Sequence, residues 1–244
     1  MIILRHTQPL VFGSDLEISG AYGGAAPVLP CYYLTFDGAN DYISLAGITI
    51  APPFTIVAWT KRTAAWNWDV VIGKNGAAGP ILAMSAGNLI YNAFGGAAQS
   101  NASAALTWTH LAAVCPVGPA TMTVFRNGVD VTAAPLGVAV GNLVYNQIGR
   151  GNSDAYCWNG QLAAIGIAPG IINVAALYAA GTFHKPLSAA TWTVACWNGR
   201  TEGGAGVALD DESAGGNDGT FKGAGEPTWG GQMIVGGPAG WSDV

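Results

Sequence analysis

Short segments rich in β-branched and aromatic residues alternate with Gly, Asn, Asp and Pro turns from Leu34 onward. The clearest example is MTVFRNGVDVT (residues 122–132), in which Asn127-Gly128 separates two runs containing Val and Phe. Asn-Gly favours a two-residue hairpin because both turn positions can adopt positive φ. Strands of this length, with turns every 8–12 residues, are typical of an antiparallel β-sandwich.

The remaining elements fit the same architecture. FTIVAWTKR (Phe54–Arg62) is apolar on both alternating faces until Lys61, which predicts an inner strand covered on two sides. One short helix is predicted at Asn173–Ala180, with Asn173 as its N-cap. Further strands are predicted at Val70–Gly73, Asn88–Phe94, Thr107–Cys115, Leu143–Gly149 and Trp158–Ala168.

The chain is unusually poor in charge. Charged residues make up 9% of it, whereas ordinary soluble domains carry about 25%. The net charge is −5 and the nine basic residues are spread out, which argues against nucleic acid as a partner. A surface with so little charge is a solubility risk for a free monomer, so we expect neighbouring subunits to cover part of it.

Targeting and redox signals are sparse. MIILRHTQPLVFG lacks the pattern of a signal peptide, and the uncharged stretch 155–183 is broken by Pro169-Gly170, so no membrane insertion is expected. The cysteines form no CxxC motif and are either buried thiols or two disulfides. They are Cys31, Cys115, Cys157 and Cys196.

Several pieces of sequence follow one another in a recognisable order between Leu34 and Thr182. They are FDGANDYISL, FTIVAWTKR with VVIGKNG, TWTHLAAV, VFRNGVDV, and NGQLAAIGI leading into AALYAAG. In this order they resemble the laminin G-like, concanavalin A-like lectin/glucanase jelly-roll superfamily. The resemblance implies an all-β, two-sheet antiparallel jelly-roll β-sandwich with one short helix over residues 31–198, preceded by an N-terminal arm, residues 1–30.

One motif of the resemblance is displaced. WNGRTEGGAGVALDDESAGGNDGTFKG (Trp197–Gly223) is similar to a segment that precedes the FDG motif in many such domains, yet here it follows the domain. We therefore expect residues 199–244 to supply either a permuted edge strand or a strand donated to a neighbouring subunit.

The acidic residues of this motif also raise the question of calcium. With Asp211 at position 1 of an EF-hand loop, Lys222 falls at position 12, where a bidentate Glu is required, so the EF-hand is excluded. The resemblance leaves Asp41, Asp210 and Asp211 as calcium candidates. The alternative, turn residues with solvated carboxylates, is favoured, and no cofactor is expected.

Catalytic patterns are not found. No strand carries the alternating acidic residues that glycosidases of this fold use, and Ala163 and Ala164 stand where the family often has acidic residues. His110, within TWTHLAAV, is interpreted as structural, and His6 and His184 have no evident acid or nucleophile partner. The sequence therefore predicts a protein that is not an enzyme.

Two stretches have the composition of a glycan site, which needs an apolar ring and planar polar groups. The carbohydrate-binding candidates are Trp66, Asn67, Trp68 and Asp69 before one strand, and Asn152, Asp154 and Tyr156 in a Gly-flanked loop. The alternative is that the two tryptophans pack within the sandwich.

Two functional hypotheses follow. The first is a structural subunit of a large assembly, most concretely a phage virion component such as a capsid decoration, cement or tail protein, which contacts other subunits or copies of itself. The second is a glycan-binding, lectin-like module for attachment to a host or cell surface, located outside the cell or at its surface.

Overall fold

The computed structural model describes the sandwich and its C-terminal segment. The described residues are 31–63, 68–75, 81–85, 90–93, 97–100, 107–117, 122–135, 142–179, 191–199, 202, 204–234 and 242–243. The predicted arm, residues 1–30, lies outside them, and the statements below concern the described residues.

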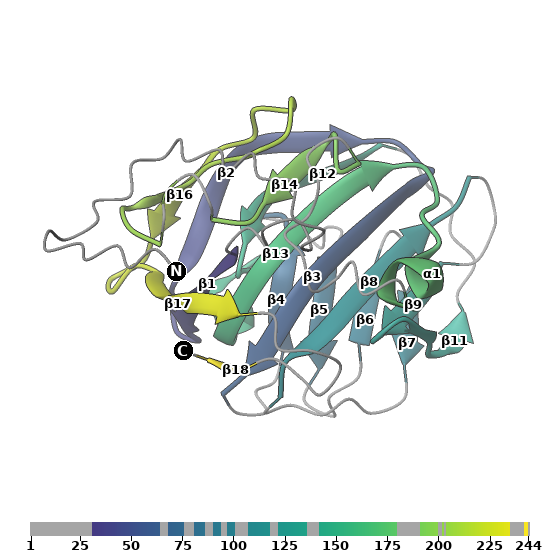
Figure 1. The fold of residues 1–244 in the computed structure, drawn as a ribbon, viewed down its shortest axis with the longest axis horizontal. Helices are drawn as coiled ribbons and strands as arrows, with labels where there is room; N and C mark the ends of the chain where they lie inside the picture. The colour runs from purple at the N-terminus through teal and green to yellow at the C-terminus, as the bar shows by residue number, and fades with distance from the viewer. Residues whose placement is uncertain are drawn as a thin grey trace, which may run out of the picture.

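Two antiparallel sheets form a sandwich (Figure 1). The front sheet in Figure 1, sheet A, has the order β10-β9-β8-β3-β13-β1-β17-β18, and β14 also pairs with β13. In that order its strands are β10 (Val129–Asp130), β9 (Thr123–Arg126), β8 (Thr109–Cys115), β3 (Phe54–Arg62), β13 (Asn159–Pro169), β1 (Cys31–Asp37), β17 (Thr228–Ile234) and β18 (Ser242–Asp243), with β14 at Ala195–Trp197.

The second sheet, sheet B, has the order β11-β7-β6-β5-β4-β12-β2-β16-β15. Its strands are β11 (Thr132–Pro135), β7 (Ala97–Ser100), β6 (Ile90–Ala93), β5 (Ile81–Ser85), β4 (Trp68–Gly73), β12 (Leu143–Ile148), β2 (Tyr42–Ile50), β16 (Gly219–Lys222) and β15 (Ala208–Leu209). The 3-10 helix η1 (Asp154–Tyr156) and the α-helix α1 (Val174–Ala179) complete the described elements. The predicted jelly-roll sandwich is confirmed.

The core explains why β3 is apolar on both faces. Ile56 and Ala58 point into the main core between the sheets, together with Leu111 and Ile72. Trp59, on the other face of β3, belongs to a second apolar cluster outside sheet A, which α1 covers (Figure 1). Because β3 is buried on both sides, its residues are apolar from Ile56 to Trp59, and its polar residues are Thr55 near its start and Thr60–Arg62 at its end.

The predicted hairpin forms between β9 and β10. Asn127 and Gly128 have φ of 49° and 77°, so both turn positions lie in the left-handed region, as an Asn-Gly hairpin requires. The Asn127 side chain also accepts a hydrogen bond from the His110 N–H at 2.9 Å, which ties the turn to β8.

The C-terminal segment completes both sheets of its own chain. β16 pairs with β2 in sheet B, and β17 pairs with β1 in sheet A. This pairing within one chain is one of the two placements that the sequence leaves open. β14, which precedes this segment, pairs with β13.

Asp211 explains the acidic motif of this segment. Its carboxylate accepts hydrogen bonds from the backbone N–H groups of Cys196, Ser213 and Asn217 at 2.8–2.9 Å. The Trp197 indole N–H in turn donates to the Asn217 carbonyl at 3.0 Å. Asp211 is 8% exposed, so this cluster is a built turn rather than a solvated acidic tail.

The four cysteines all lie in the described residues, and none forms a disulfide; each is a buried thiol. Burial raises the pKa of Cys115 to about 11 and that of Cys157 to about 12. Within the described part of the chain, no helix has the length and apolar character needed to cross a membrane.

Candidate functional site

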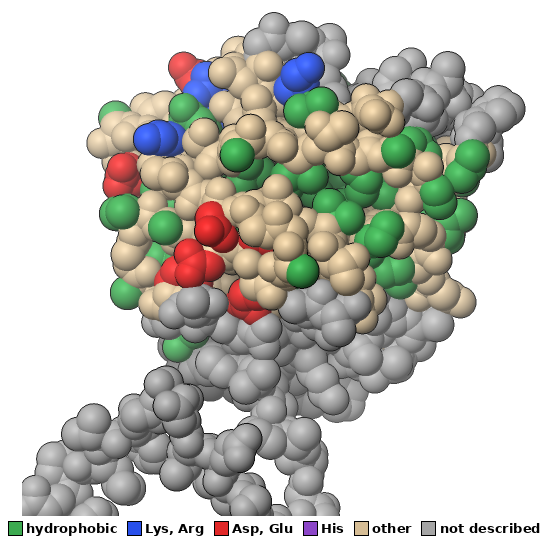
Figure 2. Space-filling model, turned by 90° about the horizontal axis from the view of Figure 1, so that it is seen from above, with side chains coloured by type: hydrophobic (Ala, Val, Ile, Leu, Met, Phe, Trp, Pro, Cys, Tyr) green, Lys and Arg blue, Asp and Glu red, His purple; other side chains and the backbone are tan. Residues whose placement is uncertain are grey.

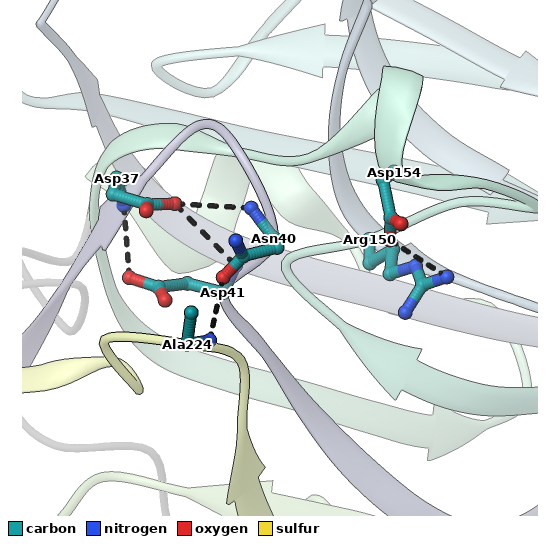
Figure 3. Close-up of polar contacts among 6 residues, drawn as sticks. All are labelled: Asp37, Asn40, Asp41, Arg150, Asp154 and Ala224. Atoms are coloured by element: carbon teal, nitrogen blue, oxygen red, sulfur yellow. Dashed lines mark hydrogen bonds and ion pairs between the residues drawn. The ribbon is translucent and has the colours of Figure 1, made fainter.

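Three loops meet at one end of the sandwich: residues 37–41 after β1, residues 149–158 around η1, and residues 223–227 after β16. A Cβ on Gly38 would lie 2.6 Å from Asn159 Cβ, which shows how closely the first loop approaches the start of β13. The Arg150 guanidinium lies 4.5 Å from the Tyr42 ring centroid and so joins the η1 loop to the start of β2. Figure 3 shows the polar groups at this end.

Asp37 organises the first loop. Its Oδ1 accepts hydrogen bonds from the backbone N–H groups of Ala39 and Asn40, at 2.7 and 3.2 Å, and more weakly from that of Asp41 (Figure 3). Asp41 Oδ2 accepts the Asp37 N–H at 3.1 Å in return. The FDGAND sequence thus forms a self-capped turn, as short Asx side chains do.

The first loop also holds the C-terminal segment. Asn40 Oδ1 accepts the Ala224 N–H at 2.8 Å, a contact between residues 184 positions apart (Figure 3). The displaced NDGT motif leads directly into this contact through β16, which pairs with Tyr42–Leu45 of β2.

Arg150 and Asp154 frame the second loop. Their side chains form an ion pair of 2.8 Å (Figure 3), with 16% of the Arg150 side chain and 64% of the Asp154 side chain exposed. Asn152 is also exposed and Tyr156 is half-buried. The loop packs against β4, because a Cβ on Gly151 would lie 3.1 Å from both Val70 Cγ2 and Tyr156 Cβ.

Trp68 lies on the side of sheet B that this loop covers. Asp69 is paired with Met84, a core residue, so Asp69 faces the core and Trp68 faces away from it. Val70, two positions after Trp68, has the same orientation and contacts the loop. Trp68 is half-buried, and β4, the strand that carries it, contacts η1 in the loop that carries Asn152, Asp154 and Tyr156.

Asp69 does not belong with these residues. Its side chain is fully buried, forms an ion pair with the equally buried Arg62, and accepts the Asn159 N–H at 3.2 Å. A glycan hydroxyl cannot reach it, so its inclusion among the sugar-binding candidates is corrected here. Trp66 and Asn67 lie outside the described residues.

The calcium candidates differ from one another. The Asp211 carboxylate is occupied by backbone donors, as described above, and Asp210 donates its N–H to Glu202 Oε1. Asp41 is 3% exposed, and one of its carboxylate oxygens accepts the Asp37 N–H. Among the described residues, no group of three or more His, Cys, Asp or Glu side chains is placed to hold a metal ion.

His110 is fully buried against the Trp59 ring, with centroids 5.3 Å apart in an edge-to-face arrangement. Burial lowers its pKa to about 3, so it is neutral at physiological pH. A neutral imidazole packed in this aromatic setting fits the structural role expected of it. His6 and His184 lie outside the described residues.

The two-sheet sandwich with loops gathered at its end defines a lectin-like β protein. The family model of the concanavalin A-like lectin/glucanases superfamily (Laminin_G_3) matches residues 37–175, more than half of the chain. The chain therefore belongs to this superfamily.

Solved structures resemble this chain to different degrees. A candidate carbohydrate binding protein from Bacteroides ovatus is 14% identical, with a TM-score of 0.61 over 83% of this chain and 59% of its own length. This chain thus spans about three fifths of that protein. A native heptameric SAP-like pentraxin from Limulus polyphemus is 14% identical, with a TM-score of 0.49 over 61% of this chain and 82% of its own. Comparison with curated protein sequences finds no match.

Contacts between distant segments are what sequence reasoning missed at this end of the molecule. The Arg150–Tyr42 stack joins the first residue of β2 to the loop that follows β12, the strand with which β2 pairs, far apart in the chain. At this end of the molecule, the sequence alone indicates a binding loop only around residue 152, where polar side chains lie close together between glycines.

Proposed function

We propose that this protein is a non-enzymatic, lectin-like module that binds glycans on the outer face of sheet B, where the η1 loop meets β4. The observation that carries this is the convergence of two separate stretches of sequence. Trp68 supplies an aromatic surface, and Asn152 and Asp154 supply exposed polar groups from the adjoining loop. An apolar ring beside a few planar polar groups is the mixture that sugar sites require.

Arg150 gives this surface its rigidity. The guanidinium stacks on Tyr42 and pairs with Asp154, so the exposed carboxylate is held at a fixed place rather than left mobile. A preorganised carboxylate loses less side-chain entropy when it accepts hydrogen bonds from sugar hydroxyls. Arg150 is therefore a positioning residue in this proposal.

The test is binding to an immobilised glycan panel. Trp68→Ala and Asp154→Asn should each weaken retention about tenfold or more, the effect of losing one good polar or stacking contact. Asp130→Asn is the matched control, because Asp130 is an exposed carboxylate on β10, in the other sheet. Unchanged retention by both site variants, with folding verified by circular dichroism, would place the glycan site elsewhere.

A second candidate function is a structural subunit of a large assembly, with a phage virion as the concrete form. Large apolar side chains are exposed at Val117, Val129, Ile171 and Val207, each more than 60% exposed, on a chain with only 9% charged residues. In Figure 2 the charged side chains lie mainly to the left, and hydrophobic ones occupy much of the right-hand part of the face. Such a surface favours coverage by neighbours.

Native mass separates the two candidates. Sedimentation of the protein from its source with a large particle supports the assembly function, and a free species near 25 kDa contradicts it. Deletion of residues 199–244 is not a clean test of assembly, because β16 and β17 belong to the sheets of the same chain and their loss would unfold it.

A further inference from the structure

Asp154, in the η1 loop, has a carboxylate with one oxygen that no protein donor occupies. Its Oδ1 binds the Arg150 guanidinium at 2.8 Å, and 64% of its side chain is exposed. Among the described residues, no donor binds its Oδ2. Because Arg150 is itself stacked on the Tyr42 ring, Asp154 presents this oxygen to solvent from a fixed place.

Acidic side chains outnumber basic ones in the three loops that meet at this end of the sandwich (Figure 3). Residues 37–41, 149–158 and 223–227 contain four carboxylates and one basic group, namely Asp37, Asp41, Asp154 and Glu226 against Arg150. All the carboxylates except that of Asp41 are exposed. Lys222, opposite Tyr42 on β16, adds one positive charge, and this end of the molecule remains negative.

The electrostatic effects of these loops overlap at the buried thiol of Cys157. Its pKa is raised to about 12, first by burial, and the Arg150 guanidinium lowers it. Three carboxylates raise it further, those of Asp154, Asp37 and Asp41. Glu226 acts on the same group of charges, because it raises the pKa of Asp41 after the larger effect of burial. A ligand at the η1 loop therefore meets the field of several carboxylates and not that of Asp154 alone.

Such a field distinguishes sugars by their charge. Uronic acids and sulfated sugars are repelled, since like charges interact within a Debye length, roughly 8 Å at physiological salt. A protonated amine carries a positive charge and three N–H donors, so it forms a charge-assisted hydrogen bond with a free carboxylate oxygen. An N-acetylated sugar has the same ring for stacking on an aromatic side chain, but it has one N–H donor and no charge.

We propose that the surface formed by Trp68, Asn152 and Asp154 selects glycans with free, protonated amino groups, the glucosamine class, a selectivity that rests on the glycan-binding function proposed above. One sugar ring of the glycan stacks on Trp68, and an ammonium group donates to Asp154 Oδ2. The exposed carboxylates of Asp37 and Glu226 attract the ligand without contacting it.

The experiment compares two ligands that differ only at nitrogen: the β-1,4-linked glucosamine hexamer and its fully N-acetylated counterpart. Calorimetric titration of the full chain near pH 6 measures both affinities. We expect the amine form to bind about tenfold more tightly, the effect of one charge-assisted hydrogen bond. The preference should shrink when NaCl is raised from about 50 to about 500 mM, because salt screens exposed charges. A galacturonic acid hexamer should bind more weakly than either.

Substitutions separate selectivity from general affinity. Asp154→Asn should bring the ratio of the two affinities close to one, whereas Trp68→Ala should weaken both ligands and retain the ratio. Glu226→Gln removes one exposed charge of the surrounding field and should lower the ratio about twofold. Asp130→Asn, which removes an exposed carboxylate in the other sheet, is the matched control and should retain the ratio.

Three results would overturn this selectivity while leaving glycan binding in place. They are equal or tighter binding of the N-acetylated hexamer, a preference that Asp154→Asn leaves unchanged, and displacement of the glucosamine hexamer by an equal concentration of hexalysine. The last would show that charge alone attracts the ligand. Binding of neither hexamer, nor of any glycan in the panel, would refute the proposed function together with the selectivity.

Discussion

The ion pair between Arg62 and Asp69 makes the sharpest stability prediction. Arg62 ends β3, Asp69 lies at the start of β4, and both side chains are fully buried. The ion pair therefore joins β3 of sheet A to β4 of sheet B. Asp69 also accepts the Asn159 N–H at 3.2 Å, so one carboxylate links β3, β4 and β13.

Asp69→Ala should cost about 3–5 kcal/mol of unfolding free energy, because it leaves the Arg62 charge buried without its carboxylate. Loss of the acceptor for the Asn159 N–H adds roughly 1–3 kcal/mol. The total is a large fraction of the 5–15 kcal/mol that folded domains typically have. Asp69→Asn should cost less than Asp69→Ala, because the amide oxygen still accepts the Asn159 N–H.

The double variant Arg62→Met/Asp69→Leu separates the attraction within the pair from the cost of burying it. Apolar replacements of buried pairs are often neutral or stabilising, so the double variant should be more stable than Asp69→Ala by several kcal/mol. Urea unfolding followed by tryptophan fluorescence measures all four proteins. If Asp69→Ala lost less than about 1 kcal/mol, the buried ion pair would not exist in solution and the reasoning would fail.

Three further predictions concern His110, the thiols and one glycine. His110 has a pKa of about 3 in the folded protein and 6.5 in the unfolded chain. The contribution of the buried neutral imidazole to the free energy of unfolding is therefore complete above pH 6.5 and is lost as pH falls toward 3, with a loss of about 2 kcal/mol at pH 5. His110→Phe should remove that part of the pH dependence measured by urea unfolding. Cys115 and Cys157, with pKa raised by burial, should react with a thiol reagent such as DTNB only after denaturation; rapid labelling of the native protein would contradict their burial. Gly160→Ala should lower Tm far more than Gly47→Ala, because both positions have positive φ but only at Gly160 would a Cβ collide with the Lys61 carbonyl; equal losses would show that φ alone decides.

Local signals predicted the elements, and the structure follows them closely. Phe54–Arg62 is β3 with the predicted bounds, and the Asn127-Gly128 turn has the predicted dihedral angles. The predicted helix is α1, shortened to Val174–Ala179, with Asn173 immediately before it. These successes depend on turn chemistry and on burial patterns, which act over a few residues.

The site could be predicted only in part, because its contacts join distant segments. The alternation of aromatic and polar residues in Trp66-Asn67-Trp68-Asp69 favours a strand, but it does not show which of its residues face the interior. The sequence pattern therefore groups Asp69 with the sugar-binding residues, although Arg62 holds it in the interior. The bond between Asn40 and Ala224, 184 positions apart, leaves no local mark in the sequence.

The C-terminal placement of β16 and β17 has a consequence for synthesis of the chain. β2 and β1 pair with β16 and β17, which are synthesised after the other strands of the sandwich to which they pair. The nascent sandwich therefore has an unpaired edge in both sheets until residues 219–234 leave the ribosome. Folding of the whole domain is thus delayed until these residues have been made, and the pairing of such distant segments is slow. Exchange of this segment between two newly made chains is the expected failure at high expression.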